Sequence, residues 1–191
     1  MVDLEMIVLR ENKIVFVSTP KAGTHTLYAI FKELGGERQP GGYHRKHLLP
    51  ECKADGWRIL TTVRSPYTRA ISAWWQLTGR EVYRDLWPAA LGGSDFDTFC
   101  DYLVSDRPLE LSSYHVCIPQ HEWLADVDVW RAMRIEEIDA ELQALDLWHT
   151  PVPVMYHEPY EPPLLTPARR RKIEQWAGDD FERYGYDKVT P

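Results

Sequence analysis

The sequence lacks the features of a membrane or secreted protein. Its apolar runs fall well short of the about 20 residues that a helix needs to cross a bilayer. The N-terminal segment MVDLEMIVLRENK carries acidic residues where a signal peptide would carry basic ones. There is no internal repeat, and the 14 prolines are scattered, which argues against a disordered low-complexity protein. We therefore expect a cytoplasmic protein with no membrane partner.

Composition also restricts the ligands. The three cysteines are odd in number and lack CxxC spacing, so we expect reduced thiols and neither a disulfide framework nor a metal site. They are Cys52, Cys100 and Cys117. The formal net charge of −7 argues against a nucleic-acid partner. Between Glu37 and Arg69, however, seven Lys and Arg residues stand against three acidic ones, which favours a small anionic ligand.

Two strand-to-helix units predict an α/β fold. Residues 13–18 are a β-branched and aromatic run typical of a buried strand, and apolar residues recur with helical spacing from Thr24 onward. Residues 57–64 predict a second buried strand, followed by Ser65 as N-cap and Pro66 at the first helical position. Strands joined by helices pair in parallel, so we expect a single domain, 1–191, with a central parallel sheet flanked by helices.

Further elements are predicted toward the C-terminus. Ser94, with Asp97 three residues later, is typical of a helix start. Thr166 followed by Pro167 indicates a last helix that runs to about Trp176. Between these helices we expect strands over Val127–Ile135 and Val152–Glu158 and a helix over residues 136–145.

The segment PKAGTHT lies where the first strand passes into the first helix. Such a turn directs backbone N–H groups and the positive end of the helix dipole toward one point, where an anion can bind. Gly23 allows close backbone approach, and Lys21 adds a full charge. Thr24 and Thr26 add hydroxyl donors. The Walker A pattern places its lysine after the second glycine, whereas Lys21 precedes the glycine by two positions. An ordinary glycine turn is the alternative.

A second group of candidates lies in TTVRSPYTRAISAWW. Arg64 ends the second strand and Ser72 lies one to two turns into the helix, so both are placed to reach a phosphate at the carboxyl edge of the sheet. Arg69 is a third candidate. The alternative is an arginine at a strand end and a helical serine without a ligand.

Together these segments resemble the sulfotransferase superfamily, which uses 3'-phosphoadenosine 5'-phosphosulfate (PAPS). The arginine of VRSPYTRAISAW follows the lysine of TPKAGTHTL by 43 residues. The segments IPQHEWLADVDVWRAMRIEEIDAEL and DDFERYGY are similar to landmarks of the carbohydrate-type branch, sometimes called sulfotransferase family 2. The C-terminal RKGxxGxW segment of the cytosolic branch has no counterpart.

The resemblance implies a P-loop-NTPase-like fold and metal-independent transfer of a sulfuryl group from PAPS to a carbohydrate or small-molecule hydroxyl. The product would be adenosine 3',5'-bisphosphate. Arg64 and Ser72 would hold the 3'-phosphate, and Lys21 would also stabilise the leaving oxygen. The loop that would hold the 5'-phosphosulfate consists of Lys21, Ala22, Gly23, Thr24, His25 and Thr26. His25 departs from the usual Ser or Thr, although a ring N–H can still donate to a phosphate oxygen.

The acceptor hydroxyl needs a base, and GGYHRKHLLPEC supplies His44 and His47. The Lys-His pair resembles the KHxxA segment of the family, whose histidine is taken as the base, so we predict His47, with His44 as the alternative. Some members use a glutamate, which here would be Glu51 or Glu122. The other histidines lack paired ligand spacing and are expected to be hydrogen-bonded surface or core residues, although His121 lies in the family-like segment and could approach the acceptor.

Two other functions remain open at this point. A nucleotide kinase or NTPase would share the P-loop-like architecture but needs magnesium ligands, and the sequence offers no strand-end aspartate suited to that task. A non-catalytic nucleotide-binding module could use the same fold without chemistry. The basic run PARRRK is expected to be a solvated helix face.

Overall fold

The computed structural model describes residues 6–39, 56–79, 93–105, 112–153 and 161–189. The chain divides into two units, of which the first comprises Met1–Arg64 with Glu122–His157. The second comprises Ser65–His121 with Glu158–Pro191. The described part of the chain contains no helix that is both long and apolar enough to cross a membrane.

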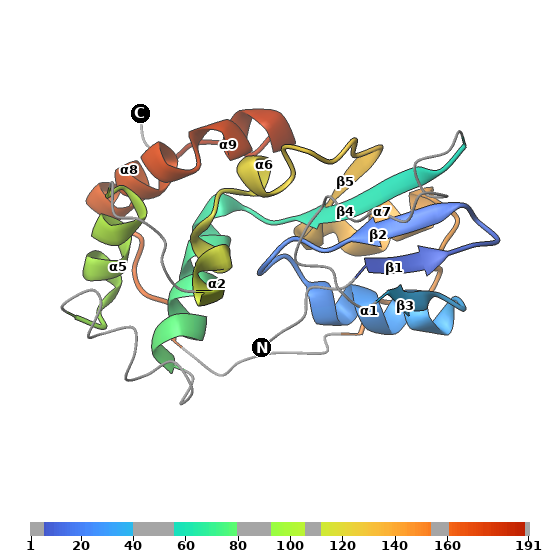
Figure 1. Ribbon diagram of the computed structural model, residues 1–191. Coiled ribbons are helices and arrows are strands. Elements are labelled where there is room, and N and C mark those ends of the chain that lie inside the picture. Colours follow the sequence, from blue (N-terminus) through green and yellow to red (C-terminus); the bar gives the residue numbers. More distant parts are fainter. Residues whose placement is uncertain (1–5, 40–55, 80–92, 106–111, 154–160, 190–191) are drawn as a thin grey trace. The chain divides into compact units, whose positions relative to one another are not determined.

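The first unit contains a five-stranded mixed sheet in the order β3-β1-β2-β4-β5 (Figure 1). The two pairings β2 with β4 and β4 with β5 are parallel. By contrast, β1 runs antiparallel to both β2 and β3. The strands are β1 (Met6–Leu9), β2 (Ile14–Val17), β3 (Glu37–Gln39), β4 (Arg58–Val63) and β5 (Arg131–Arg134).

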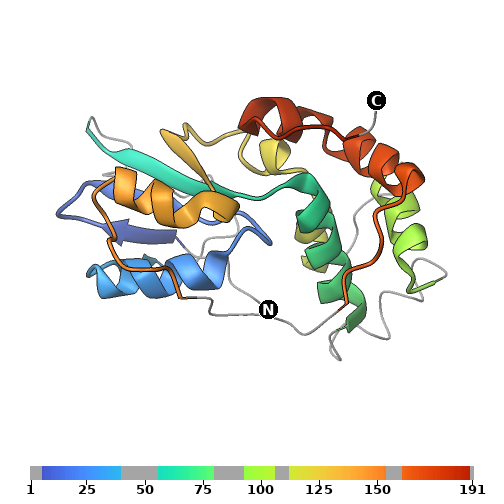
Figure 2. The same cartoon turned by 180° about the vertical axis from the view of Figure 1, so that it is seen from behind.

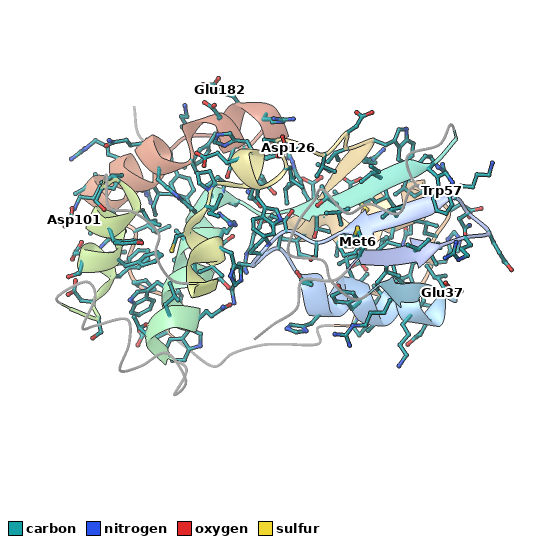
Figure 3. The ribbon with its side chains drawn as sticks, in the orientation of Figure 1. Met6, Glu37, Trp57, Asp101, Asp126 and Glu182 are labelled. Carbon is teal, nitrogen blue, oxygen red and sulfur yellow. The ribbon has the colours of Figure 1, made fainter. Side chains whose placement is uncertain are left out.

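The prediction of a parallel sheet is therefore correct for three strands and wrong for β1 and β3. A tight turn over Arg10–Lys13 joins β1 to β2, with the Lys13 N–H donating to the Arg10 carbonyl over 3.2 Å. So short a connection permits only antiparallel pairing, because a parallel neighbour needs a long crossover. On β3, Glu37, which is labelled in Figure 3, pairs with Arg10 of this turn at 3.0 Å.

Two helices cover one face of the sheet: α1 (Thr24–Glu33) and α7 (Ile138–Ala144). Figure 2, which views the molecule from behind, shows both helices in front of the strands. Strand side chains alternate between faces. Those packed against α1 and α7 include Ile7, Ile14, Phe16, Leu60 and Met133. The opposite face buries Met6, Val8, Val15, Val17, Ile59 and Val127.

The second unit is helical. Its core gathers around Tyr67, Phe99 and Phe181, and the Phe181 ring meets the Tyr67 ring edge-on at 5.0 Å. The remaining helices within the described residues are α2 (Pro66–Gly79), α5 (Phe96–Leu103), η3 (Ser112–Cys117), α6 (Gln120–Trp123), α8 (Pro167–Trp176) and α9 (Gly178–Tyr184). A short 3₁₀ turn, η4 (Ile135–Glu137), precedes α7.

The sequence predicted that the basic run of α8 is a solvated helix face. In the structure, two of these basic residues instead form ion pairs with α5. Arg169 forms a bidentate pair with Asp97 of α5, with distances of 2.8 and 2.6 Å. One turn on, Lys172 pairs with Asp101, which is labelled in Figure 3. These pairs fasten α8 alongside α5, as Figure 1 shows.

Several predicted boundaries shift. The N-cap of α5 is Asp95, whose carboxylate accepts the Thr98 N–H at 2.9 Å, and not Ser94. Strand β5 begins only at Arg131, because Val127 lies in a turn and donates its N–H to Leu124. Val152 is not in a strand, and residues 154–158 of that predicted strand lie outside the described residues.

Other boundaries agree with the prediction. The segment expected as a helix over 136–145 contains α7 from Ile138 onward, after the η4 turn. Thr166 caps α8 as predicted, since its hydroxyl accepts the Arg169 N–H at 3.4 Å. Helices α1 and α2 begin where the strand-to-helix pattern placed them.

We expect Leu60→Ala to lower the free energy of unfolding of the first unit by about 2–5 kcal/mol, because Leu60 is fully buried on a central strand and its removal leaves a cavity. Leu164→Ala is the control, since Leu164 is 77% exposed, and should change the value by less than about 0.5 kcal/mol. Urea denaturation followed by tryptophan fluorescence measures both. Equal losses in the two variants would contradict the core assignment.

Candidate functional site

The loop between β2 and α1 is anchored to β4 by threonine side chains. The Thr61 hydroxyl donates to the Val17 carbonyl over 2.7 Å and lies 3.0 Å from the Thr19 hydroxyl. Thr19 and Thr61 are both fully buried. In addition, the indole N–H of Trp123 donates to the Ser18 carbonyl over 3.1 Å. The start of the loop is thus fixed before its exposed part begins.

The loop backbone twice enters the left-handed region. Lys21 has φ 65° and Gly23 has φ 80°. Between them, the Ala22 N–H closes the turn by donating to the Thr19 carbonyl over 3.2 Å. Backbones that change handedness within a short turn bring successive N–H groups to one side, which makes a concavity suited to an anion.

Gly23 is needed for a second reason. A Cβ built on it would lie 2.3 Å from Cδ1 of Ile135, the residue that follows β5. No side chain fits there without displacing Ile135. The sequence analysis assigned Gly23 to close approach of the backbone to an anion, whereas the close neighbour in the structure is the Ile135 side chain.

Helix α1 begins without a side chain that accepts hydrogen bonds from the backbone N–H groups of its first turn. Gly23 is its N-cap, no side chain caps it, and the first turn carries no acidic residue. The N–H groups of Thr24, His25 and Thr26 have no carbonyl four residues earlier within the helix. An anion held by these groups would also meet the positive end of the helix dipole.

The predicted loop ligands differ in what they can offer. The Thr24 hydroxyl donates to the Thr19 carbonyl over 3.2 Å, so its backbone N–H is the donor that remains for a ligand. Ala22 is fully buried, and its N–H is used within the turn. Thr26 is half-buried, whereas the side chain of His25 is exposed.

Arg64 lies beside the loop, as the motif predicted. Its Nη1 donates to the Lys21 carbonyl over 3.4 Å. The register that pairs Val17 with Thr61 explains this proximity, because Arg64 follows Thr61 by three residues at the same end of the sheet. Two residues that are 43 positions apart are therefore brought together at one loop.

Ser72 and Arg69 lie on α2, in the second unit. Ser72 is half-buried. Arg69 is fully buried, donates from Nη2 to the Ile118 carbonyl over 2.7 Å, and places its guanidinium 5.3 Å from the ring centre of Trp176. These contacts make Arg69 a packing residue of the helical unit, and the third candidate for the phosphate is withdrawn.

The predicted bases His47 and His44, and the alternative Glu51, lie outside the described residues. Glu122 is described and is an exposed residue of α6. Within the described ranges, no three His, Cys, Asp or Glu side chains are grouped so that they could hold a metal ion.

The cysteines with described positions are buried free thiols, Cys100 and Cys117. Burial raises the pKa of each thiol to about 12, so neither is a nucleophile near neutral pH. Cys52 lies outside the described residues.

A histidine–aspartate pair in the second unit was missed by the sequence analysis. The carboxylate of Asp180, which is fully buried on α9, accepts the backbone N–H groups of Gln120 and His121 at 2.9 and 2.7 Å. It also lies 2.8 Å from Nδ1 of the His121 ring. The two residues are 59 positions apart, and no local pattern joins them.

No protein-family model matches the chain, and no curated protein or solved structure gives a significant match. The arguments on function below therefore depend on the residues and their geometry.

We expect Gly23→Ala to destabilise the first unit more than Gly35→Ala. Both glycines have φ near 80°, but a Cβ on Gly35 would meet nothing within 4 Å. The left-handed backbone alone should cost about 1 kcal/mol at either site, and the clash with Ile135 should add about 1–3 kcal/mol at Gly23. Urea unfolding of both variants separates these contributions, and Ile135→Ala in the Gly23→Ala background should recover part of the difference. Equal destabilisation would contradict the close approach of Ile135.

Proposed function

We propose that the protein is a PAPS-dependent sulfotransferase of the carbohydrate type, with a P-loop-NTPase-like fold. The observation that carries the proposal is the contact between Arg64 and the Lys21 carbonyl, in the loop that precedes α1. The guanidinium of Arg64, a helix N-terminus without an acidic residue and a turn with φ values of 65° at Lys21 and 80° at Gly23 thus lie at the end of two parallel strands, and Lys21 in the turn carries a second positive charge. A ligand with more than one phosphate group suits such a site.

Each group has a separate role in the proposed reaction. PAPS would supply an activated sulfuryl group, which in-line attack by the acceptor oxygen transfers. The Lys21 ammonium and the N–H groups at the start of α1 would stabilise the charge that develops on the leaving 5'-phosphate oxygen. Arg64, with Ser72, is assigned to the 3'-phosphate. The base predicted from the sequence is His47, with His44 as the alternative.

The same observations favour a phosphosulfate over a magnesium-bound triphosphate. A Walker-type site uses a Ser or Thr hydroxyl on the metal, but the Thr24 hydroxyl is already donated to the Thr19 carbonyl. Strand β4 is followed by Arg64, where a nucleotide kinase or NTPase would use a carboxylate near the metal. These two differences place the kinase alternative second.

We expect Arg64→Ala to weaken binding of adenosine 3',5'-bisphosphate by about 10- to 100-fold, because a charge-assisted hydrogen bond to phosphate is lost. Isothermal titration calorimetry with EDTA present measures this affinity without a metal. Lys32→Ala is the matched control, since Lys32 lies exposed in the last turn of α1, away from the loop. Wild-type affinity in Arg64→Ala would contradict the phosphate assignment. Binding of ATP that requires magnesium would instead favour the kinase alternative.

We expect Lys21→Ala to lower kcat by about 10²–10³-fold while weakening binding of the bisphosphate product by much less. The reason is that its charge matters most when the leaving oxygen becomes negative. Release of adenosine 3',5'-bisphosphate from PAPS, followed by chromatography, gives kcat, and calorimetry gives the product affinity. Equal losses in both quantities would show that Lys21 only binds the nucleotide. Product binding without any release from PAPS by the wild type would favour the non-catalytic module.

A further inference from the structure

The side chain of Ile135 packs directly against the glycine from which α1 begins. A Cβ built on Gly23 would lie 2.3 Å from Cδ1 and 2.8 Å from Cγ1 of Ile135, so the isoleucine occupies the space of a side chain at residue 23. Gly35 has nearly the same φ, 81° against 80°, but a Cβ there would meet nothing within 4 Å. A left-handed glycine therefore does not by itself require such a neighbour.

Two neighbouring elements fix the backbone of Ile135. It follows Arg134, the last residue of β5, which pairs with Val63 of β4. Three residues later, Ile138 begins α7 and is buried in the core that α1 and α7 cover. Ile135 itself is half-buried and packs against the same core. The sheet and α7 thus determine where this side chain meets Gly23.

Hydrogen bonds hold the loop on either side of Gly23. The Thr19 carbonyl accepts both the Ala22 N–H and the Thr24 hydroxyl, each at 3.2 Å. The Gly23 carbonyl accepts the Leu27 N–H at 3.1 Å, which is the first backbone hydrogen bond of α1. Glycine has more conformational freedom than any other residue. A neighbour that restricts Gly23 therefore also restricts the direction of the N–H groups that follow it.

Ile135 can influence an anion at this loop only through the backbone. Its side chain is a hydrocarbon and offers no hydrogen-bond donor. The groups assigned above to the 5'-phosphate include the N–H groups of residues 24–26, which follow Gly23. A protein that is in its binding conformation for only part of the time binds its ligand more weakly by that fraction. Packing that keeps Gly23 in one conformation therefore strengthens binding of this phosphate.

We propose that Ile135 is a positioning residue for the 5'-phosphate. Its contact with Gly23 keeps the N–H groups at the start of α1 in the arrangement that binds this phosphate. Because the ligand is adenosine 3',5'-bisphosphate, this inference rests on the proposed function. The 3'-phosphate is assigned to other residues, so its binding does not depend on the contact.

The test compares adenosine 3',5'-bisphosphate with adenosine 5'-monophosphate and adenosine 3'-monophosphate. We expect Ile135→Ala to weaken binding of the bisphosphate and the 5'-monophosphate by about 5- to 20-fold, because the loop spends less time in its binding conformation. The affinity for the 3'-monophosphate should not change. Isothermal titration calorimetry measures the bisphosphate, and displacement titrations against it measure the more weakly bound monophosphates.

Two further variants separate positioning from stability. Ile135→Val removes only Cδ1, so it should fold, show the same preference among the nucleotides and lose less affinity than Ile135→Ala. Leu145→Ala is the matched control, since Leu145 is also half-buried against the same core, at the C-terminal end of α7. It should lower the free energy of unfolding, as measured with urea, but leave all three affinities unchanged.

The outcomes distinguish this inference from the proposed function. Equal weakening of all three nucleotides in the Ile135 variants would show a general structural defect and would overturn the positioning role. Wild-type affinity for the 5'-monophosphate in Ile135→Ala, or the same selective loss in Leu145→Ala, would also overturn it. In each case a wild type that binds the bisphosphate leaves the proposed function intact. A wild-type protein that does not bind the bisphosphate would overturn both.

Discussion

The parallel pairing of β2 with β4 is the constraint on which the first unit depends. It places the carboxyl ends of two strands at one edge of the sheet, where the chain turns into α1 after one strand and toward α2 after the other. The Thr61 hydroxyl then ties the two ends together through the Val17 carbonyl and the Thr19 hydroxyl. Without that register, Arg64 would not reach the Lys21 carbonyl.

Strand β5, the third parallel strand, also contributes to the packing of the loop between β2 and α1. Pairing of β5 with β4 brings Ile135 to the loop, where it occupies the space that a side chain on residue 23 would need. The loop is therefore packed against a hydrophobic side chain, and the start of α1 has no side-chain cap. A helix start without a side-chain cap suits anion binding, because its N–H donors are positioned before the ligand arrives.

Local patterns predicted the elements that carry the loop, and failed where structure depends on distant partners. Strand β2 and helices α1 and α2 follow from apolar spacing and from Pro66 at a helix start. Strands β1 and β3 are only four and three residues long, and they exist because they pair with neighbours in the sheet. The N-cap of α5 is Asp95 and not Ser94. Both residue types can cap a helix, so only the folded structure shows which of the two does.

In the candidate site, too, local patterns indicated some features, and others depend on residues distant in the sequence. Spacing and residue type led to the expectation that Arg64, at a strand end, lies near the loop of Lys21 and Gly23, and the contact of Arg64 with the Lys21 carbonyl agrees with that proximity. The role of Thr24 as a hydroxyl donor could not be judged, because the Thr19 carbonyl that accepts its proton is a backbone group. The pairing of His121 with Asp180 joins α6 to α9 across 59 residues, so it became visible only in the folded chain.

Net charge is a poor guide to what this site attracts. The protein carries a formal charge of −7, but many of its carboxylates are held by nearby cations, as in the pairs of Arg131 with Glu141 and of Arg169 with Asp97. Around the loop, basic residues outnumber acidic ones. The first turn of α1 contains no acidic residue, and β4 is followed by Arg64. At physiological ionic strength charges act over about 8 Å, so an anion at the loop responds to these neighbours far more than to the distant acidic surface. The local distribution of charge therefore favours an anion at this loop, whatever the net charge of the protein.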